Sequence, residues 1–123
     1  MKRIFGLFPP VLIFGLGFLV NDYYAWDFGT FETIDSGLIS DAAWRISQGQ
    51  VPYEDFGTIQ GLSAALVEAF FITLFGANLT ALVVHASFVN GVAGVAVYLI
   101  LRTVEAGRPA AFCFAALTTI VFY

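Results

Sequence analysis

Apolar residues gather in four long runs along the chain, and polar segments separate them. The runs cover residues 4–20, 58–76, 79–101 and 109–123, and Glu68 and His85 are the ionisable acid and base within them. About 20 apolar residues in a helix match the roughly 30 Å hydrocarbon core of a bilayer. The pattern therefore predicts a membrane-spanning helix in each run.

A polar segment, residues 21–57, lies between the first two runs. Within it, four apolar side chains recur at helical spacing: Leu38, Ile39, Ala42 and Ile46. This spacing predicts a short amphipathic helix over residues 35–48, with those side chains in one buried stripe facing the membrane surface or the helix bundle. Gly49 is the expected stop, and Pro52 lies beyond the end of the helix.

These elements predict an all-α fold. It is a polytopic transmembrane helix bundle whose extracytoplasmic loop carries a short amphipathic juxtamembrane helix. Residues 1–123 would form the N-terminal part of one multi-span membrane domain. The last apolar run reaches Tyr123 without a polar residue after it. A terminal carboxylate there would lie inside the bilayer, which is costly, so we expect the natural protein to continue beyond this fragment.

Composition supports the membrane interpretation. Hydrophobic residues make up 59% of the chain and charged residues 11%, and the mean hydropathy is +0.86. A soluble domain of this size exposes much of its surface and could not bury so much apolar area. Seven of the nine acidic residues lie between Asp22 and Asp55, with Arg45 as the one base among them. The chain has no basic patch, so nucleic-acid binding is not predicted.

The positions of the basic residues predict the orientation in the cell (inner) membrane. Lys2 and Arg3 precede the first run and place the N-terminus in the cytoplasm, so loop 21–57 is extracytoplasmic. A cleaved signal peptide is disfavoured, because no small-x-small site follows the first run. If the second and third runs both cross, Arg102 and Arg108 fall outside, against the usual bias. The side of their loop stays open.

Three features of the apolar runs suggest contacts between helices. Glu68 is a functional candidate as an ionisable group in an apolar run, and it could equally be protonated and packed, or bonded to a neighbour. His85 is expected to bond between helices, because no second His or Cys lies at ligand spacing and a metal site of the zinc type is therefore not predicted. The third run has a small-residue face, where another helix could approach closely: Ser87, Gly91 and Gly94.

An ordered set of short motifs occupies residues 35–61. Its members are Asp35, Gly37, Ala43-Trp44-Arg45, Gly49, Pro52-Tyr53, Asp55-Phe56 and Gly61. The set resembles the first extracytoplasmic loop of GT-C membrane glycosyltransferases. These polyprenyl-phosphate-sugar-dependent enzymes are related to the protein mannosyltransferases and the aminoarabinose transferase. Residues 74–79 also resemble the end of that family's second helix. Two positions depart from the family's pattern. Ser36 stands where the family often has a second acid, and Leu62 stands where it has the proline of a Gly-Pro-Leu motif at the start of the next helix.

The resemblance implies roles for particular residues. Asp35 matches the catalytic base, which would take a proton from an acceptor hydroxyl as it attacks the lipid-linked sugar with inversion. The same carboxylate could instead, or also, orient a divalent metal; the sequence leaves this open. Asp55, Arg45 and Tyr53 are the expected substrate-binding residues. The implied partners are a lipid-linked sugar donor, membrane lipid and the rest of the truncated chain.

Simpler interpretations stand beside these roles. Asp35 could cap the amphipathic helix, and Asp55 could be a turn residue. Arg45 could pair with Asp41 four residues earlier, and Tyr53, like Trp44, could be an interfacial anchor. The alternative functions are a small non-enzymatic membrane subunit and a fragment of a transporter whose proton-handling groups are Glu68 and His85. The fragment alone is expected to be inactive.

Overall fold

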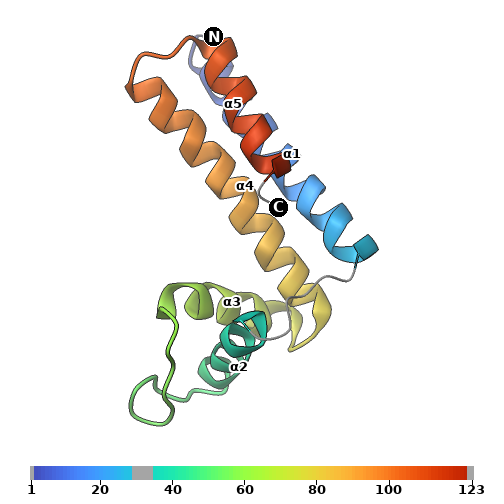
Figure 1. Cartoon of the computed structure of the whole chain (residues 1–123), viewed down its shortest axis with the longest axis vertical. Helices are drawn as coiled ribbons and strands as arrows, with labels where there is room; N and C mark the ends of the chain where they lie inside the picture. Colours follow the sequence, from blue (N-terminus) through green and yellow to red (C-terminus); the bar gives the residue numbers. More distant parts are fainter. Residues whose placement is uncertain (1, 29–34, 122–123) are drawn as a thin grey trace. The chain divides into compact units, whose positions relative to one another are not determined.

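The computed structural model describes residues 2–28 and 35–121, and for residues 2–7, 26–28 and 35–36 it describes the backbone alone. This part of the chain is all-helical, as predicted, and holds no strand. Its five helices are α1 (Lys2–Phe28), α2 (Asp35–Ser47), α3 (Leu62–Phe75), α4 (Leu79–Thr103) and α5 (Arg108–Val121) (Figure 1).

The helices form two compact units, and α4 takes part in both. Unit 1 comprises Met1–Phe28 and Ala86–Tyr123, so it contains α1, α5 and most of α4. Unit 2 comprises Gly29–His85, so it contains α2, α3 and the first turns of α4. Each unit has its own buried cluster.

Among the described residues, α4 is the one helix long and apolar enough to cross a membrane by length and composition. Its 25 residues reach about 38 Å, which exceeds the roughly 30 Å of a bilayer core. Only 33% of its most apolar window is buried inside the chain. The rest of that surface is large and apolar, and such surfaces mark contact with lipid or with another protein.

Helix α1 continues into residues that the sequence pattern assigned to the polar loop. The predicted helix covered residues 4–20, whereas α1 reaches Phe28. No glycine or proline interrupts the chain between Asn21 and Phe28. Asn21 is buried, and its Nδ2 donates a hydrogen bond to Ser87 Oγ at 3.1 Å. The polar side chain is therefore part of the contact with α4 rather than of a solvated loop.

The three helices of unit 1 approach closely where residues are small. A Cβ on Gly17 would lie 3.1 Å from Gly91 Cα, and a Cβ on Gly91 would lie 2.9 Å from the backbone oxygen of Phe14. A Cβ on Gly94 would overlap the side-chain methyl group of Thr119. Figure 1 shows α4 running beside α1 and α5. The small-residue face predicted on the third run is confirmed as a packing face.

Unit 2 has a small core between α2 and α3. Its buried members are Ala42, Ala43, Ala65, Ala69, Phe71, Ile72 and Ala81, with Ile39 and Ile46 packed against them. The predicted stripe on α2 is thus formed by Ile39, Ala42 and Ile46, but Leu38 is 42% exposed. At about 100° per residue, Leu38 lies about 40° from Ala42 and about 100° from Ile39, so it stands at the edge of the stripe, and its inclusion among the buried residues was wrong.

The boundaries of α3 differ from the predicted range of 58–76. Gly61 is the N-cap residue, and a hydrogen bond from the backbone N–H of Gly76 to Ile72 O at 2.8 Å closes the other end. Asn78 then joins α3 to α4. Its Nδ2 donates to Phe75 O at 2.6 Å, while its Oδ1 accepts the N–H of Ala81 at 3.1 Å. This satisfies backbone groups at two helix ends with one side chain.

Candidate functional site

The residues that resemble the GT-C loop lie on α2 and on the turn that follows it. At the end of α2, Gly49 has φ +85°. Its N–H donates to Ile46 O at 2.9 Å, and the N–H of Gln50 donates to Arg45 O at 3.1 Å. This pair of bonds is a Schellman motif, which favours glycine because of the positive φ. The predicted stop at Gly49 is confirmed, and the motif turns the chain back at a defined angle.

The turn after Pro52 is closed by its own hydrogen bonds. Asp55 Oδ2 accepts the N–H of Val51 at 2.7 Å. The N–H of Tyr53, which has φ +67°, donates to Phe56 O at 2.8 Å. Asp55 therefore acts as a turn residue here, as the simpler interpretation predicted. Its carboxylate remains exposed, so its second oxygen can still meet a ligand.

Arg45 lies in the last turn of α2 and contacts Phe56 of this turn. Its Nε donates to Asp41 Oδ2 at 2.8 Å, which confirms the predicted pair. Its guanidinium carbon lies 5.7 Å from the centre of the Phe56 ring, within the range of a cation–π contact. The side chain is still 36% exposed. Two contacts thus orient Arg45 and leave part of its guanidinium free to meet an anion.

The remaining predicted site residues differ in how far the structure describes them. Asp35 is the first residue of α2, but its side chain lies outside the described atoms. Its roles as base, metal ligand or cap stay predictions. Tyr53 is 66% exposed and Trp44 44% exposed. Both are accessible for an interfacial or a substrate-binding role.

A second polar site, in unit 2, joins the two ionisable residues of the apolar runs. His85 Nδ1 lies 3.5 Å from Glu68 Oε2, and both side chains are mostly buried. The Phe71 ring lies 5.7 Å from the His85 ring. Glu68 is thus bonded to a neighbour, one of the two outcomes left open, and His85 makes the expected interhelical contact. Sequence reasoning selected both residues but did not pair them, although two ionisable groups in adjacent apolar helices are expected to meet.

Comparisons with protein-family models, with curated proteins and with solved structures found no match. The likeness to GT-C enzymes therefore rests on the order and spacing of the sequence motifs. Among the side chains that the structure describes, no three His, Cys, Asp or Glu residues gather as metal ligands. The carboxylate of Asp35, the predicted metal ligand, is outside this set.

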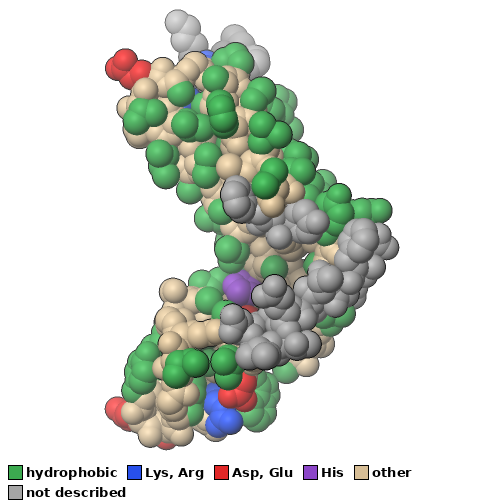
Figure 2. All heavy atoms as spheres, in the orientation of Figure 1, with side chains coloured by type: hydrophobic (Ala, Val, Ile, Leu, Met, Phe, Trp, Pro, Cys, Tyr) green, Lys and Arg blue, Asp and Glu red, His purple; other side chains and the backbone are tan. Residues whose placement is uncertain are grey.

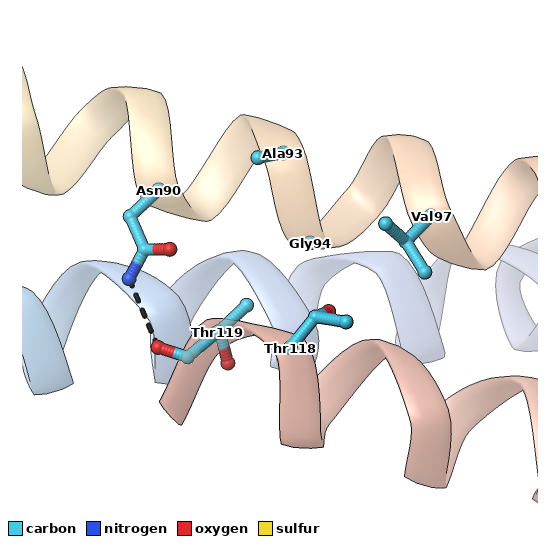
Figure 3. Close-up of a pocket in the computed structure, with 6 residues that line it drawn as sticks. All are labelled: Asn90, Ala93, Gly94, Val97, Thr118 and Thr119. Carbon is cyan, nitrogen blue, oxygen red and sulfur yellow. Dashed lines mark hydrogen bonds between the residues drawn. The ribbon is translucent and has the colours of Figure 1, made fainter. Parts of the chain in front are cut away.

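Unit 1 contains a groove of about 310 Å³ between α4 and α5. It is lined by Asn90, Ala93, Gly94, Val97, Thr118 and Thr119 (Figure 3). Asn90 Nδ2 donates to Gly17 O at 2.9 Å and to Thr119 O at 3.1 Å. The hydroxyls of Thr118 and Thr119 donate to carbonyls of their own helix, at 2.7 and 2.8 Å. With these groups occupied, the groove offers apolar surface and little polar chemistry for a sugar.

The Glu68–His85 pair leads to a testable energetic prediction. Truncating either residue alone leaves the other without this partner, so Glu68→Leu and His85→Leu should each destabilise the protein. A double-mutant cycle measured by unfolding in detergent should give a coupling of about 1–2 kcal/mol. The matched control is the exposed Asp41–Arg45 pair, for which a cycle with alanine should give about 0.3–0.5 kcal/mol. Additive effects at Glu68 and His85 would mean that the two residues do not interact in the folded protein.

Proposed function

We propose that the chain is the N-terminal part of a GT-C membrane glycosyltransferase. The intact enzyme would move a sugar from a polyprenyl-phosphate donor to an extracytoplasmic acceptor. The observation that carries the proposal is the ordered motif set from Asp35 to Gly61. The structure is compatible with it, because α2 begins at Asp35 and the Schellman motif at Gly49 leads directly into the Pro52–Phe56 turn.

The proposed setting is a polytopic membrane bundle in the inner membrane, with the N-terminus cytoplasmic and α2 outside. The length and apolar surface of α4 support a membrane location. Large exposed hydrophobic side chains on both units support it as well (Figure 2). A lipid-linked donor presents its reactive carbon at the membrane surface. A loop that follows α1 directly in the sequence would keep its carboxylates near that surface.

In the proposed reaction, Asp35 removes the proton from the acceptor hydroxyl. The hydroxyl oxygen then bonds to the anomeric carbon while the bond from that carbon to the phosphate oxygen breaks, and the configuration inverts. The leaving polyprenyl phosphate carries the developing negative charge. Arg45 is proposed to contact that phosphate, because guanidinium groups bind phosphate oxygens well. Tyr53 and Asp55 are proposed to contact the sugar.

A transfer assay tests the proposal. Membranes containing the full-length protein are incubated with radiolabelled polyprenyl-phosphate mannose or polyprenyl-phosphate aminoarabinose, and label is counted in the acceptor fraction. Membranes without the protein are the control. Protein-dependent transfer from at least one polyprenyl-phosphate sugar is expected. A known GT-C enzyme in the same membranes is the positive control. If that enzyme transfers sugar and this protein does not, the protein is not an enzyme of this donor class.

The orientation gives a separate prediction. In a Cys113→Ser background, Ser47→Cys at the end of α2 should react with a membrane-impermeant maleimide in intact spheroplasts. The reason is that the cytoplasmic Lys2 and Arg3 place α2 outside. The parent with Cys113→Ser alone is the unlabelled control. Labelling that occurs only after lysis would show that α2 faces the cytoplasm.

The buried Glu68–His85 pair favours transport as a second candidate function. A carboxylate and an imidazole within 3.5 Å can pass a proton between them. Proton-coupled uptake into vesicles that depends on both residues, without any sugar transfer, would support this function over the enzyme.

A further inference from the structure

Arg45 is held at its backbone as well as at its side chain. Its carbonyl oxygen accepts the N–H of Gln48 and the N–H of Gln50, each at 3.1 Å, at the C-terminal end of α2. Its Nε donates to Asp41 Oδ2 at 2.8 Å, and its guanidinium carbon lies 5.7 Å from the centre of the Phe56 ring. A long and otherwise flexible side chain is therefore restricted at both ends.

The ring that contacts Arg45 is itself fixed in place. The side chain of Phe56 is half-buried and packs against the buried cluster of unit 2. Its backbone oxygen accepts the N–H of Tyr53 at 2.8 Å, which closes the turn that begins at Pro52. Because the ring packs against this cluster, its contact with the guanidinium ties Arg45 to the core of unit 2.

These contacts leave the end of the guanidinium available. Within the described part of the chain, the Arg45 side chain makes its hydrogen bond through Nε, and Nη1 and Nη2 have no protein partner. The side chain is 36% exposed. The planar fork of an arginine matches two oxygens of a phosphate group, so a guanidinium whose Nε is occupied can still bind phosphate through its two terminal nitrogens.

The exposed pair of Asp41 and Arg45 contributes little to stability, because both side chains keep much of their contact with water. Its effect on an anion has two opposing parts. The hydrogen bond orients the guanidinium, which favours binding, whereas the negative charge of Asp41 offsets the charge of Arg45, which weakens binding. An asparagine at position 41 would keep an acceptor oxygen and lose the charge, so substitutions there can separate the two parts.

We propose that Asp41 and Phe56 are positioning residues for Arg45. Together they orient Nη1 and Nη2 toward the phosphate of the polyprenyl-phosphate donor before the donor binds. Less side-chain freedom is then lost on binding, which strengthens it. The inference rests on the proposed function, because that function supplies the phosphate group. Both residues act through Arg45 and are not catalytic residues.

Binding of polyprenyl phosphate tests the role of Phe56 without any need for sugar transfer. Radiolabelled polyprenyl phosphate is titrated onto purified full-length protein in nanodiscs. Phe56→Leu keeps an apolar side chain but removes the aromatic face, so it should raise Kd about 2–5-fold. Phe56→Tyr keeps the face and should bind as the parent does. The matched control is Val84→Ala on α4, which also reduces packing against the cluster and should leave Kd at the parental value.

Two substitutions at Asp41 test the hydrogen bond separately from the charge. Asp41→Ala and Asp41→Asn remove the same negative charge, so a difference between them reports the orientation of Arg45. The alanine variant should bind polyprenyl phosphate about 2–5-fold more weakly than the asparagine variant. Equal Kd values for the two variants would overturn the positioning role of Asp41.

An Arg45→Ala background shows whether these effects act through Arg45. Arg45→Ala alone should raise Kd about 10-fold or more, because charge-assisted hydrogen bonds to the phosphate are lost. In this background, Phe56→Leu should cause no further rise in Kd, and the alanine and asparagine variants of Asp41 should bind alike. A structural defect would persist without Arg45. Effects as large as those in the parent would therefore overturn the proposal.

The transfer assay separates this inference from the proposed function. In the full-length enzyme, Phe56→Leu should lower kcat/KM for the donor by at least the factor by which it raises Kd, because negative charge on the phosphate grows in the transition state. A parent that binds polyprenyl phosphate with this dependence on Arg45 but transfers no sugar would contradict the proposed function alone. A parent that transfers sugar while the Phe56 and Asp41 variants bind as it does would contradict the inference alone. A parent that does not bind polyprenyl phosphate would contradict the inference as well.

Discussion

If Asp35 is the catalytic base, replacing it by asparagine lowers the rate of sugar transfer by the full-length enzyme about 10²–10⁴-fold. This loss is equivalent to about 3–5 kcal/mol of activation free energy. Asparagine preserves the shape of the side chain and still favours a helix start, but it cannot accept the proton of the acceptor. The loss should fall on kcat, with little change in KM for the donor, because the proton is transferred only as the transition state forms.

The Asp35 experiment needs three further variants or conditions. Glu54→Gln removes an exposed acid from the same loop and should transfer sugar at the parental rate. If Asp35→Asn is near parental while Asp55→Asn is inactive, the base has been assigned to the wrong carboxylate. If both are near parental, this loop has no catalytic role. A chelator separates the two proposed roles of Asp35. If the carboxylate orients a divalent metal, the chelator should abolish the parental activity. If the carboxylate acts as the base alone, the chelator should leave the parental activity unchanged.

Replacing Gly91 by alanine destabilises unit 1 by about 1–3 kcal/mol, because the new methyl group overlaps atoms that are packed against it. A Cβ there would lie 2.9 Å from the backbone oxygen of Phe14 and 2.8 Å from its ring. That backbone belongs to α1, so relief requires α1 and α4 to move apart. Gly17→Ala should have a smaller effect of the same sign, since its closest contacts are 3.0–3.2 Å.

Gly15→Ala is the matched control in α1. A Cβ at Gly15 would have nothing within 4 Å. Alanine is favoured over glycine inside a helix, so this variant should be neutral or more stable by about 0.5–1 kcal/mol. Equilibrium unfolding in mixed detergent micelles gives the three free energies. Equal effects at Gly15 and Gly91 would show that α1 and α4 do not pack through Gly91.

Much of the local structure followed from the sequence. The ends of α2 and the pairing of Asp41 with Arg45 depend on spacing along one helix, and both were predicted correctly. The order of the motifs from Asp35 to Gly61 is also a property of the sequence, and no later observation tests the catalytic role that it implies. The turn role of Asp55 was one of two interpretations, and the Val51 hydrogen bond supports it.

Errors arose where the helix boundary or the buried face depends on a neighbouring helix. The segment that begins at Asn21 contains polar residues and was assigned to a loop. The side chain of Asn21 is nevertheless buried, and it donates a hydrogen bond to Ser87 of α4. Leu38 has the right spacing for the stripe of α2, but the contact with α3 is centred on Ala42 and Ala43, where small side chains allow close approach. Hydrophobic periodicity identifies the apolar side of a helix, but it does not show which of those apolar side chains a neighbouring helix buries.

The sequence by itself thus determined the helical class, the apolar runs and the glycine stops, because these depend on hydrophobicity and backbone conformation within a few residues. Only the tertiary structure decided which distant residues meet. Glu68 could have been protonated and packed alone, and it is the approach of α3 to the first turns of α4 that places His85 beside it. The same packing separates α3 into a buried face, with Ala65, Glu68 and Ala69, and an exposed face, with Leu66, Phe70 and Leu74. An apolar run of uniform hydrophobicity carries no such division, since the division depends on where a second helix lies.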